Sequence, residues 1–114
     1  MCIFNWYISV DTSQPIEINV YPKEQKVRDK DIAMFECKTS VSPRPTIFWK
    51  RNGIRIDSHG AYATYRTWSG AILRIEPVTV DRDDARFECV VDDYIRPAAS
   101  ASGILRVYPD ALSE

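Results

Sequence analysis

Short runs of alternating hydrophobic and polar residues recur along the chain, and turn-forming residues separate them. In AMFECKT and in ARFECVV nearly every second residue is apolar, which places Cys37 and Cys89 on the hydrophobic faces of their runs. No stretch keeps the 3.6-residue period of an amphipathic helix over three turns. The pattern therefore predicts an all-β protein.

Nine strands are expected from this pattern and from the turn residues between the runs. Asn52-Gly53 supplies the positive φ angles of a tight hairpin between the fourth and fifth strands. The expected strands are Ile16–Val20, Gln25–Arg28, Ile32–Thr39, Thr46–Arg51, Arg55–Asp57, Tyr62–Thr67, Ala71–Ile75, Ala85–Asp92 and Ser100–Tyr108.

Length and composition predict a single domain. A chain of 114 residues that is 45% hydrophobic can bury one core. We expect a flexible N-terminal segment over residues 1–14, a domain over 15–109 and a tail or linker over 110–114. The opening MCIFNWYISV lacks the basic start and the cleavage site of a secretion signal, and no apolar run is long enough to insert into a membrane.

The charge distribution excludes one class of partner. A net charge of -1 and a pI of about 5.8 argue against a nucleic-acid partner, because proteins that bind nucleic acids are usually basic overall. Between Arg44 and Arg74, however, six basic residues accompany one acid. A local cationic surface is therefore expected within a slightly acidic domain.

Three cysteines allow one disulfide and one leftover thiol, and their spacings do not fit zinc or thioredoxin-type sites. Cys37, Trp49 and Cys89, with DDARFEC leading into the last, form the arrangement of an inter-sheet disulfide and a packed indole found in immunoglobulin domains. We therefore predict a two-sheet immunoglobulin-like β-sandwich of the I-set type, with Cys37 bonded to Cys89. Trp49, Leu73 and Phe87 are the expected core, and Cys2 is expected to be a free thiol rather than an intermolecular bridge.

The run SGAILRIEPVTVDRDDARFEC, together with SPRPTIFWKRNG, resembles the first immunoglobulin domain of LAR-type receptor protein tyrosine phosphatases over roughly Ile16 to Pro109. The resemblance implies an extracellular recognition module of a cell-adhesion or axon-guidance receptor, with protein ligands on opposing cells or matrix and with the phosphatase domains outside this chain. In that family a lysine-rich hairpin after the tryptophan binds sulfated glycosaminoglycans. The matching positions here hold Arg51, Asn52, Gly53, Ile54 and Arg55, with Lys50 just before them, so the resemblance implies that two of the four basic positions are retained and two are lost.

This hairpin is the candidate binding site. Lys50, Arg51 and Arg55 flank one tight turn, and we expect them to converge on a sulfated polyanion such as heparan or chondroitin sulfate. Arg44 and Arg66 are possible helpers. Arg74 is a weaker candidate because its strand is expected in the opposite sheet.

Other chemistry finds little support. His59 is the only histidine, and no activated nucleophile is recognisable, so neither catalysis nor a cofactor is expected. The acids of VDRDD (Asp81, Asp83, Asp84) lack calcium-loop spacing and fit a strand-connecting corner better.

Two readings stay open. Tyr62, Tyr65 and Trp68 form either an exposed contact surface or part of the core. The rival function is a structural immunoglobulin domain of an intracellular muscle-type tandem array, which would use the same sandwich as a mechanical link.

Overall fold

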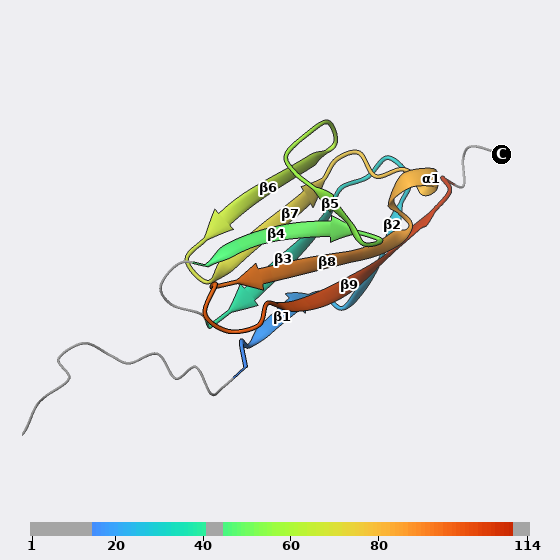
Figure 1. Ribbon diagram of the computed structural model, residues 1–114. Coiled ribbons are helices and arrows are strands. Elements are labelled where there is room, and N and C mark those ends of the chain that lie inside the picture. The colour runs from blue at the N-terminus through green and yellow to red at the C-terminus, as the bar shows by residue number, and fades with distance from the viewer. Residues whose placement is uncertain (1–14, 41–44, 111–114) are drawn as a thin grey trace, which may run out of the picture.

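A computed structural model of the chain describes residues 15–40 and 45–110, which form nine strands in two sheets and one helical turn. The four-stranded sheet has the order β1 (Ile18–Tyr21), β3 (Ala33–Thr39), β7 (Gly70–Ile75) and β6 (Tyr62–Thr67). The five-stranded sheet has the order β2 (Glu24–Arg28), β9 (Ala99–Tyr108), β8 (Ala85–Asp92), β4 (Thr46–Arg51) and β5 (Ile54–Ile56). The two sheets stack face to face (Figure 1). The predicted sandwich is confirmed, and the expected strand ends differ from the observed ones by at most two residues.

The first part of the chain contributes to both sheets. β1 pairs antiparallel with β3, whereas β2 pairs parallel with β9, so the chain crosses between the layers around Pro22. All other paired strands are antiparallel. The alternating pattern predicted both strands but not the change of sheet, because alternation specifies a buried face and not its pairing partner.

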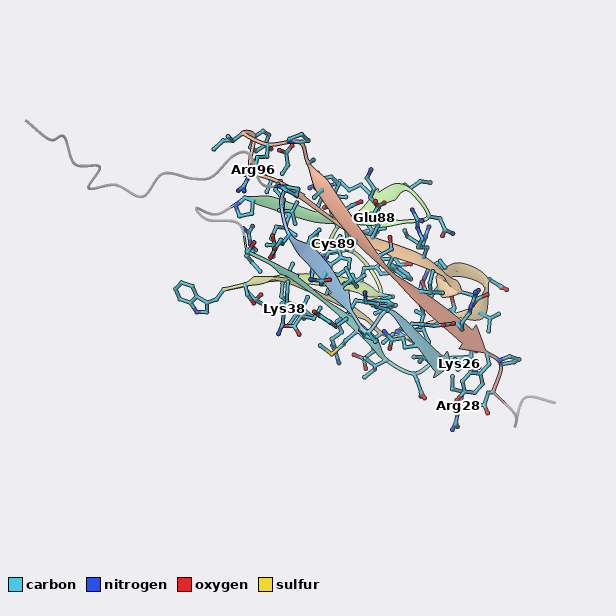
Figure 2. The ribbon with its side chains drawn as sticks, turned by 90° about the horizontal axis from the view of Figure 1, so that it is seen from below. Lys26, Arg28, Lys38, Glu88, Cys89 and Arg96 are labelled. Carbon is cyan, nitrogen blue, oxygen red and sulfur yellow. A yellow bond between two sulfur atoms is a disulfide. The ribbon has the colours of Figure 1, made fainter. Side chains whose placement is uncertain are left out.

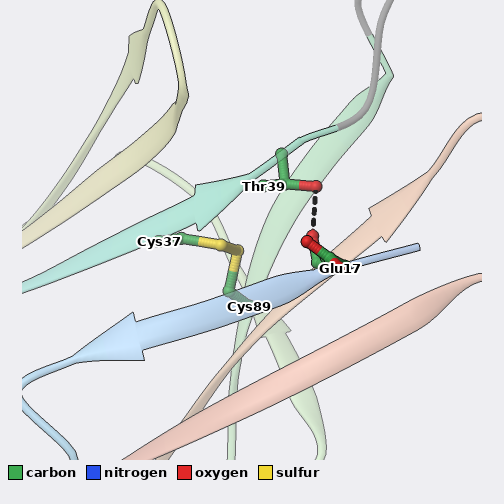
Figure 3. Close-up of a disulfide and its surroundings, with 4 residues drawn as sticks. All are labelled: Glu17, Cys37, Thr39 and Cys89. Atoms are coloured by element: carbon green, nitrogen blue, oxygen red, sulfur yellow. Dashed lines mark hydrogen bonds between the residues drawn. A yellow bond between two sulfur atoms is a disulfide. The ribbon is translucent and has the colours of Figure 1, made fainter. Parts of the chain in front are cut away.

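The disulfide joins the two layers at their centres. Cys37 on β3 and Cys89 on β8 are bonded, with their Cα atoms 6.2 Å apart, as predicted (Figure 3). Trp49 lies opposite Cys89 in the β4–β8 ladder, so its indole is beside the bridge. Near the bridge, the Thr39 hydroxyl donates to the Glu17 carbonyl over 2.8 Å and ties β3 to the residue before β1.

The core contains the expected residues. Trp49, Leu73 and Phe87 are almost completely buried, and Phe35 packs its ring 5.6 Å from that of Phe87. Gly103 on β9 permits this packing, since a Cβ atom there would lie 2.4 Å from the Phe35 ring. The core therefore consists of interlocking side chains from both sheets.

A single helical turn, α1 (Val80–Asp83), connects the sheets between β7 and β8 and contacts β9 (Figure 1). It was not predicted, because four residues are too few to show a helical period. It holds Asp83, the one charged residue that is fully buried among those described.

Several expectations fall outside the described residues. They concern the N-terminal segment 1–14 with Cys2, residues 41–44 with Arg44, and residues 111–114. None of the helices among residues 15–40 and 45–110 is long and apolar enough to span a bilayer.

Candidate functional site

The β4–β5 hairpin carries the candidate site and is fastened to β8. Asn52 and Gly53 have φ angles of 47° and 86°, as predicted for the tight turn. The Asn52 N–H donates to the Arg86 carbonyl over 2.9 Å, and the Arg86 N–H donates to Asn52 Oδ1 over 3.0 Å. The turn is therefore held against the sheet rather than projecting freely.

Lys50 and Arg55 face each other across this hairpin. They are direct cross-strand partners, and because Trp49 points into the core, both point to the outer face of the five-stranded sheet. The Arg55 guanidinium lies 4.5 Å from the centre of the Phe48 ring, and the Lys50 ammonium lies 6.0 Å from it. Asp57 accepts from Arg55 Nε over 3.2 Å, but both side chains are more than half exposed, so this pair restrains Arg55 only weakly.

Arg51 does not join them, which corrects the expected convergence of three cations. It occupies the inward phase of β4, and its Nη1 donates to the Tyr62 hydroxyl across the sandwich over 2.6 Å. Its guanidinium also lies 5.7 Å from the centre of the Tyr62 ring. Alternation along a strand explains the result, since residues 50 and 51 must point to opposite faces.

Tyr62 belongs to a buried corner instead of an exposed surface. Its hydroxyl donates to Asp83 Oδ1 over 2.6 Å, and Arg82 binds the same carboxylate through Nε and Nη2. The Thr79 N–H donates to Asp83 Oδ2 over 2.8 Å. The acid therefore forms the strand-connecting corner that the sequence favoured over calcium.

Charge and burial shift the pKa values of this corner. Burial raises the pKa of Asp83, but hydrogen bonds from Arg82 and Tyr62 outweigh it, so the net pKa lies below the usual carboxyl value. Burial, followed by the hydrogen bond to Asp83, raises the pKa of Tyr62. Asp83 is therefore held as a carboxylate and Tyr62 as a neutral phenol.

The possible helpers lie elsewhere. Arg66 is on β6 in the opposite sheet, and its Nη2 donates to the Pro45 carbonyl over 2.6 Å. Arg74 is on β7 in the same sheet as Arg66, as expected, and pairs with Glu76 over 2.6 Å. From the predicted set, the structure therefore brings together only Lys50 and Arg55.

Arg86 on β8 also lies beside the hairpin. Sequence reasoning missed it, because its position next to the hairpin depends on the β4–β8 register.

Exposed apolar residues gather at the other end of the sandwich. Trp68, in the β6–β7 turn, is 98% exposed, and Tyr94 and Ile95 are 77% and 60% exposed in the β8–β9 loop at the same end (Figure 1). Asp93 holds this loop together: its side chain is 5% exposed, it accepts the N–H groups of Ile95 and Arg96, and it pairs with the Arg96 guanidinium over 2.9 Å. Hydrogen bonds from these backbone groups lower the pKa of Asp93. Of the three aromatics in doubt, Tyr65 and Trp68 are exposed and Tyr62 is not.

No group of three or more histidine, cysteine or acidic side chains capable of holding a metal occurs among the described residues. His59 is exposed in the loop before β6, where its backbone bridges to Tyr62. The Phe48 ring holds the Arg55 guanidinium and the Lys50 ammonium on one outer face, and two cations held in this way are suited to binding an anion.

Comparison with known proteins places this geometry in context. A family model described as "Immunoglobulin domain" matches residues 15–92. The tyrosine-protein phosphatase Lar of Drosophila melanogaster is 39% identical over 101 residues, which is 87% of this chain and 5% of that protein. The chain thus corresponds to a small part of this relative.

Solved structures agree with this match. The crystal structure of the N-terminal Ig1-2 module of the Drosophila receptor protein tyrosine phosphatase DLAR superposes with a TM-score of 0.75 at 36% identity, covering 86% of this chain and 51% of that one. The titin M4 structure superposes with a TM-score of 0.74 at 18% identity, covering 82% and 95%. The second likeness concerns the fold alone.

Proposed function

Because the chain belongs to the immunoglobulin domain family and is of the LAR type, we propose that it is an extracellular recognition module of an adhesion-type receptor that binds protein ligands and sulfated glycosaminoglycans. It binds and does not catalyse. Any phosphatase activity belongs to domains outside this chain.

The cross-strand pair of Lys50 and Arg55 carries the glycan proposal. Two adjacent cations on one outer face can contact neighbouring sulfates of the same chain, and the planar guanidinium of Arg55 can bind a sulfate through two N–H groups. Phe48 supports the guanidinium from below. Because two of the four basic positions of the family's hairpin are lost here, binding should be weaker than in relatives with a full lysine hairpin.

The exposed loop end supports a protein contact. Tyr and Trp are enriched where proteins bind one another, and Trp68 and Tyr94 are largely exposed to solvent. Backbone hydrogen bonds at Ser69 and Tyr94 tie these segments to the fold. A protein ligand on an opposing cell or in the matrix is therefore proposed to dock at this end. The glycan pair lies on a different surface.

The disulfide distinguishes this proposal from an intracellular muscle-type array. Disulfides persist in oxidising environments and are rare where thiols are kept reduced. The Cys37–Cys89 bridge therefore supports an extracellular module, whereas the likeness to titin fits both functions equally.

Heparin chromatography tests the glycan proposal. We expect the 114-residue chain to be retained on heparin resin at about 0.05 M salt, where surface charges are weakly screened, and to elute as salt is raised. Changing Lys50→Ala and Arg55→Ala together should shift elution to lower salt. Passage of the unmodified chain through the resin would refute glycan binding.

A matched control separates the site from net charge. Lys38→Ala with Arg74→Ala also removes two cations, but from the four-stranded sheet. This variant should elute close to the parent. Arg51→Ala is unsuitable as a site variant because it removes a hydrogen bond to Tyr62 and weakens the fold.

A further inference from the structure

Two pairs of like charges face each other across the described β-ladders. Lys50 pairs with Arg55 in the β4–β5 ladder, and Lys26 pairs with Arg106 in the β2–β9 ladder. Every other pair in these ladders is uncharged, singly charged or, at Lys50 and Glu88, oppositely charged. Like charges placed directly opposite each other destabilise a sheet. Two such pairs lie on one sheet, and they concentrate positive charge there.

Both pairs lie on the outer face of the five-stranded sheet. Trp49 on β4 and Val107 on β9 are buried, so the alternating positions Lys50 and Arg106 point outward. Lys26 and Arg28 are exposed on β2 by the same alternation, and Figure 2 shows them together at the end of β2 beside β9.

Arg86 connects the two pairs. It is exposed on β8, next to the turn at Asn52, and it pairs with Ile104 on β9, two residues before Arg106. The cations therefore follow a diagonal across all five strands. We call this line the cationic diagonal; its members are Arg55, Lys50, Arg86, Arg106, Lys26 and Arg28.

The dimensions of a sheet give the length of this line. Four interstrand steps of about 4.8 Å and six residue steps of about 3.3 Å place Arg55 and Arg28 roughly 28 Å apart. The spacing between successive cations is then about 5 to 8 Å. A linear polyanion with regularly repeated charges matches such a line better than a compact anion does.

Acids near the line engage some of the cations only weakly and do not pair with the others. Arg55 pairs with Asp57, and Arg106 lies 3.7 Å from Glu24, but all four side chains are more than half exposed. Glu88 lies beside Lys50, and Asp84 accepts the Val107 N–H over 3.1 Å. Among the described residues, no carboxylate forms an ion pair with Lys26, Arg28 or Arg86.

We infer that a sulfated glycosaminoglycan binds along the whole cationic diagonal, so that the site continues from the hairpin over β8 and β9 to β2. The inference rests on the proposed glycan function and extends its site by four residues that sequence reasoning did not select. A chain bound in this way bridges both like-charge pairs and offsets their repulsion with its sulfates.

Two double variants of the full chain test the inference. The far variant, Lys26→Ala with Arg106→Ala, removes the pair remote from the hairpin, and the near variant removes Lys50 and Arg55. Each should lower the affinity for long heparin by about 5- to 20-fold at low salt and reduce the slope of log affinity against log salt by about 1 to 2. The control variant, which lacks Lys38 and Arg74, should stay within about twofold of the parent, because salt screens charges on the opposite sheet from the bound chain.

Oligosaccharide length gives an independent readout. Size-defined heparin fragments much shorter than the roughly 28 Å line can contact only part of it. The loss caused by the far variant should therefore grow with fragment length until the fragment spans the line, and then level off. Thermal midpoints equal to or higher than that of the parent would show that all variants remain folded, since each of the near and far variants also removes a repulsive pair.

The outcomes separate this inference from the proposed function. If the near variant loses affinity while the far variant behaves like the control, the hairpin proposal stands and the cationic diagonal is refuted. Equal losses in all three variants would mean that net charge alone governs binding, and would refute the diagonal as well. Failure of the parent to bind heparin, or tighter binding to duplex DNA or anionic vesicles, would refute the glycan proposal itself.

Discussion

Two tryptophans show how much a residue's position decides its role. Trp49 is 1% exposed beside the disulfide, whereas Trp68 is 98% exposed in a turn. The burial of Trp49 was predictable, because it lies in the sequence between Cys37 and Cys89, which both occupy inward-facing positions of their strands. The exposure of Trp68 was not, since an aromatic residue next to Ser69-Gly70 is compatible with either a core or a surface position.

Replacing Trp49 by alanine should therefore cost about 3 to 5 kcal/mol, because it removes a buried aromatic and leaves a cavity. Denaturant unfolding would measure the loss. Trp68→Ala is the matched control and should change stability by no more than about 0.5 kcal/mol. Similar effects from the two substitutions would contradict the assigned burial.

At the scale of elements, a hydrogen bond from Tyr62 on β6 to Asp83 on α1 takes the place of the usual tyrosine-corner hydrogen bond. Phe87 occupies the position where many immunoglobulin domains have a tyrosine with a corner hydrogen bond. Tyr62 packs its ring 6.4 Å from that of Phe87 and supplies a hydroxyl to Asp83 from the other sheet. The corner therefore keeps a phenol, but from β6 instead of β8.

The lowered pKa of Asp83 predicts a pH-dependent contribution to stability. A carboxyl whose pKa is lower in the folded state stabilises the fold above its ordinary pKa of about 3.9, and this stability is lost as the pH falls through the lowered pKa. Asp83→Asn should cost about 1.5 to 3 kcal/mol at pH 7 by removing the charged acceptor of Arg82. Unfolding at a series of pH values would measure the difference, which should shrink towards pH 2.

The exposed Asp81, also in α1, provides the control. Asp81→Asn should have little effect at either pH, because its carboxylate is solvated. A constant difference between Asp83→Asn and the parent from pH 7 to pH 2 would show that the charge of Asp83 is not what stabilises the corner.

The sequence predicted elements better than it predicted the site. The alternation of apolar and polar residues and the turn residues between the runs predicted nine strands. The inward-facing positions of Cys37 and Cys89 predicted the disulfide. The convergence of Lys50, Arg51 and Arg55 was wrong because proximity in sequence was given more weight than the opposite phases of neighbouring strand residues. Arg86, Arg106 and Lys26 could not be found in this way, since their adjacency exists only through the register of separate strands.

At the scale of the whole molecule, the two outer faces differ in charge. The five-stranded sheet carries the cationic diagonal, whereas the outer face of the four-stranded sheet has the cations Lys38 and Arg74, the acid Glu36, and apolar side chains such as Tyr65. A slightly acidic chain can therefore present one anion-binding face. The net charge of the chain argued against a nucleic-acid partner, but it could not show that the positive charges gather on one face.

The disulfide connects the two sheets through the core and contributes to the stability of the whole domain. Cys37 and Cys89 are 52 residues apart, and closing a loop of this size contributes about 4 kcal/mol on the chain-entropy model. For a domain of about 100 residues this corresponds to roughly 15 to 30 °C in the melting midpoint. Reduction of the chain should therefore lower its midpoint by an amount in this range.

A Cys37→Ala, Cys89→Ala double variant shows whether that shift comes from the bridge. It should melt near the reduced parent and respond little to reductant, because no other bridge is expected if Cys2 is a free thiol. Non-reducing peptide mapping should recover Cys37 linked to Cys89, and a linkage from Cys2 to either residue would contradict both assignments. A parent midpoint that does not respond to reduction would favour the muscle-type alternative, since a domain that works in a reducing compartment must be stable without its bridge.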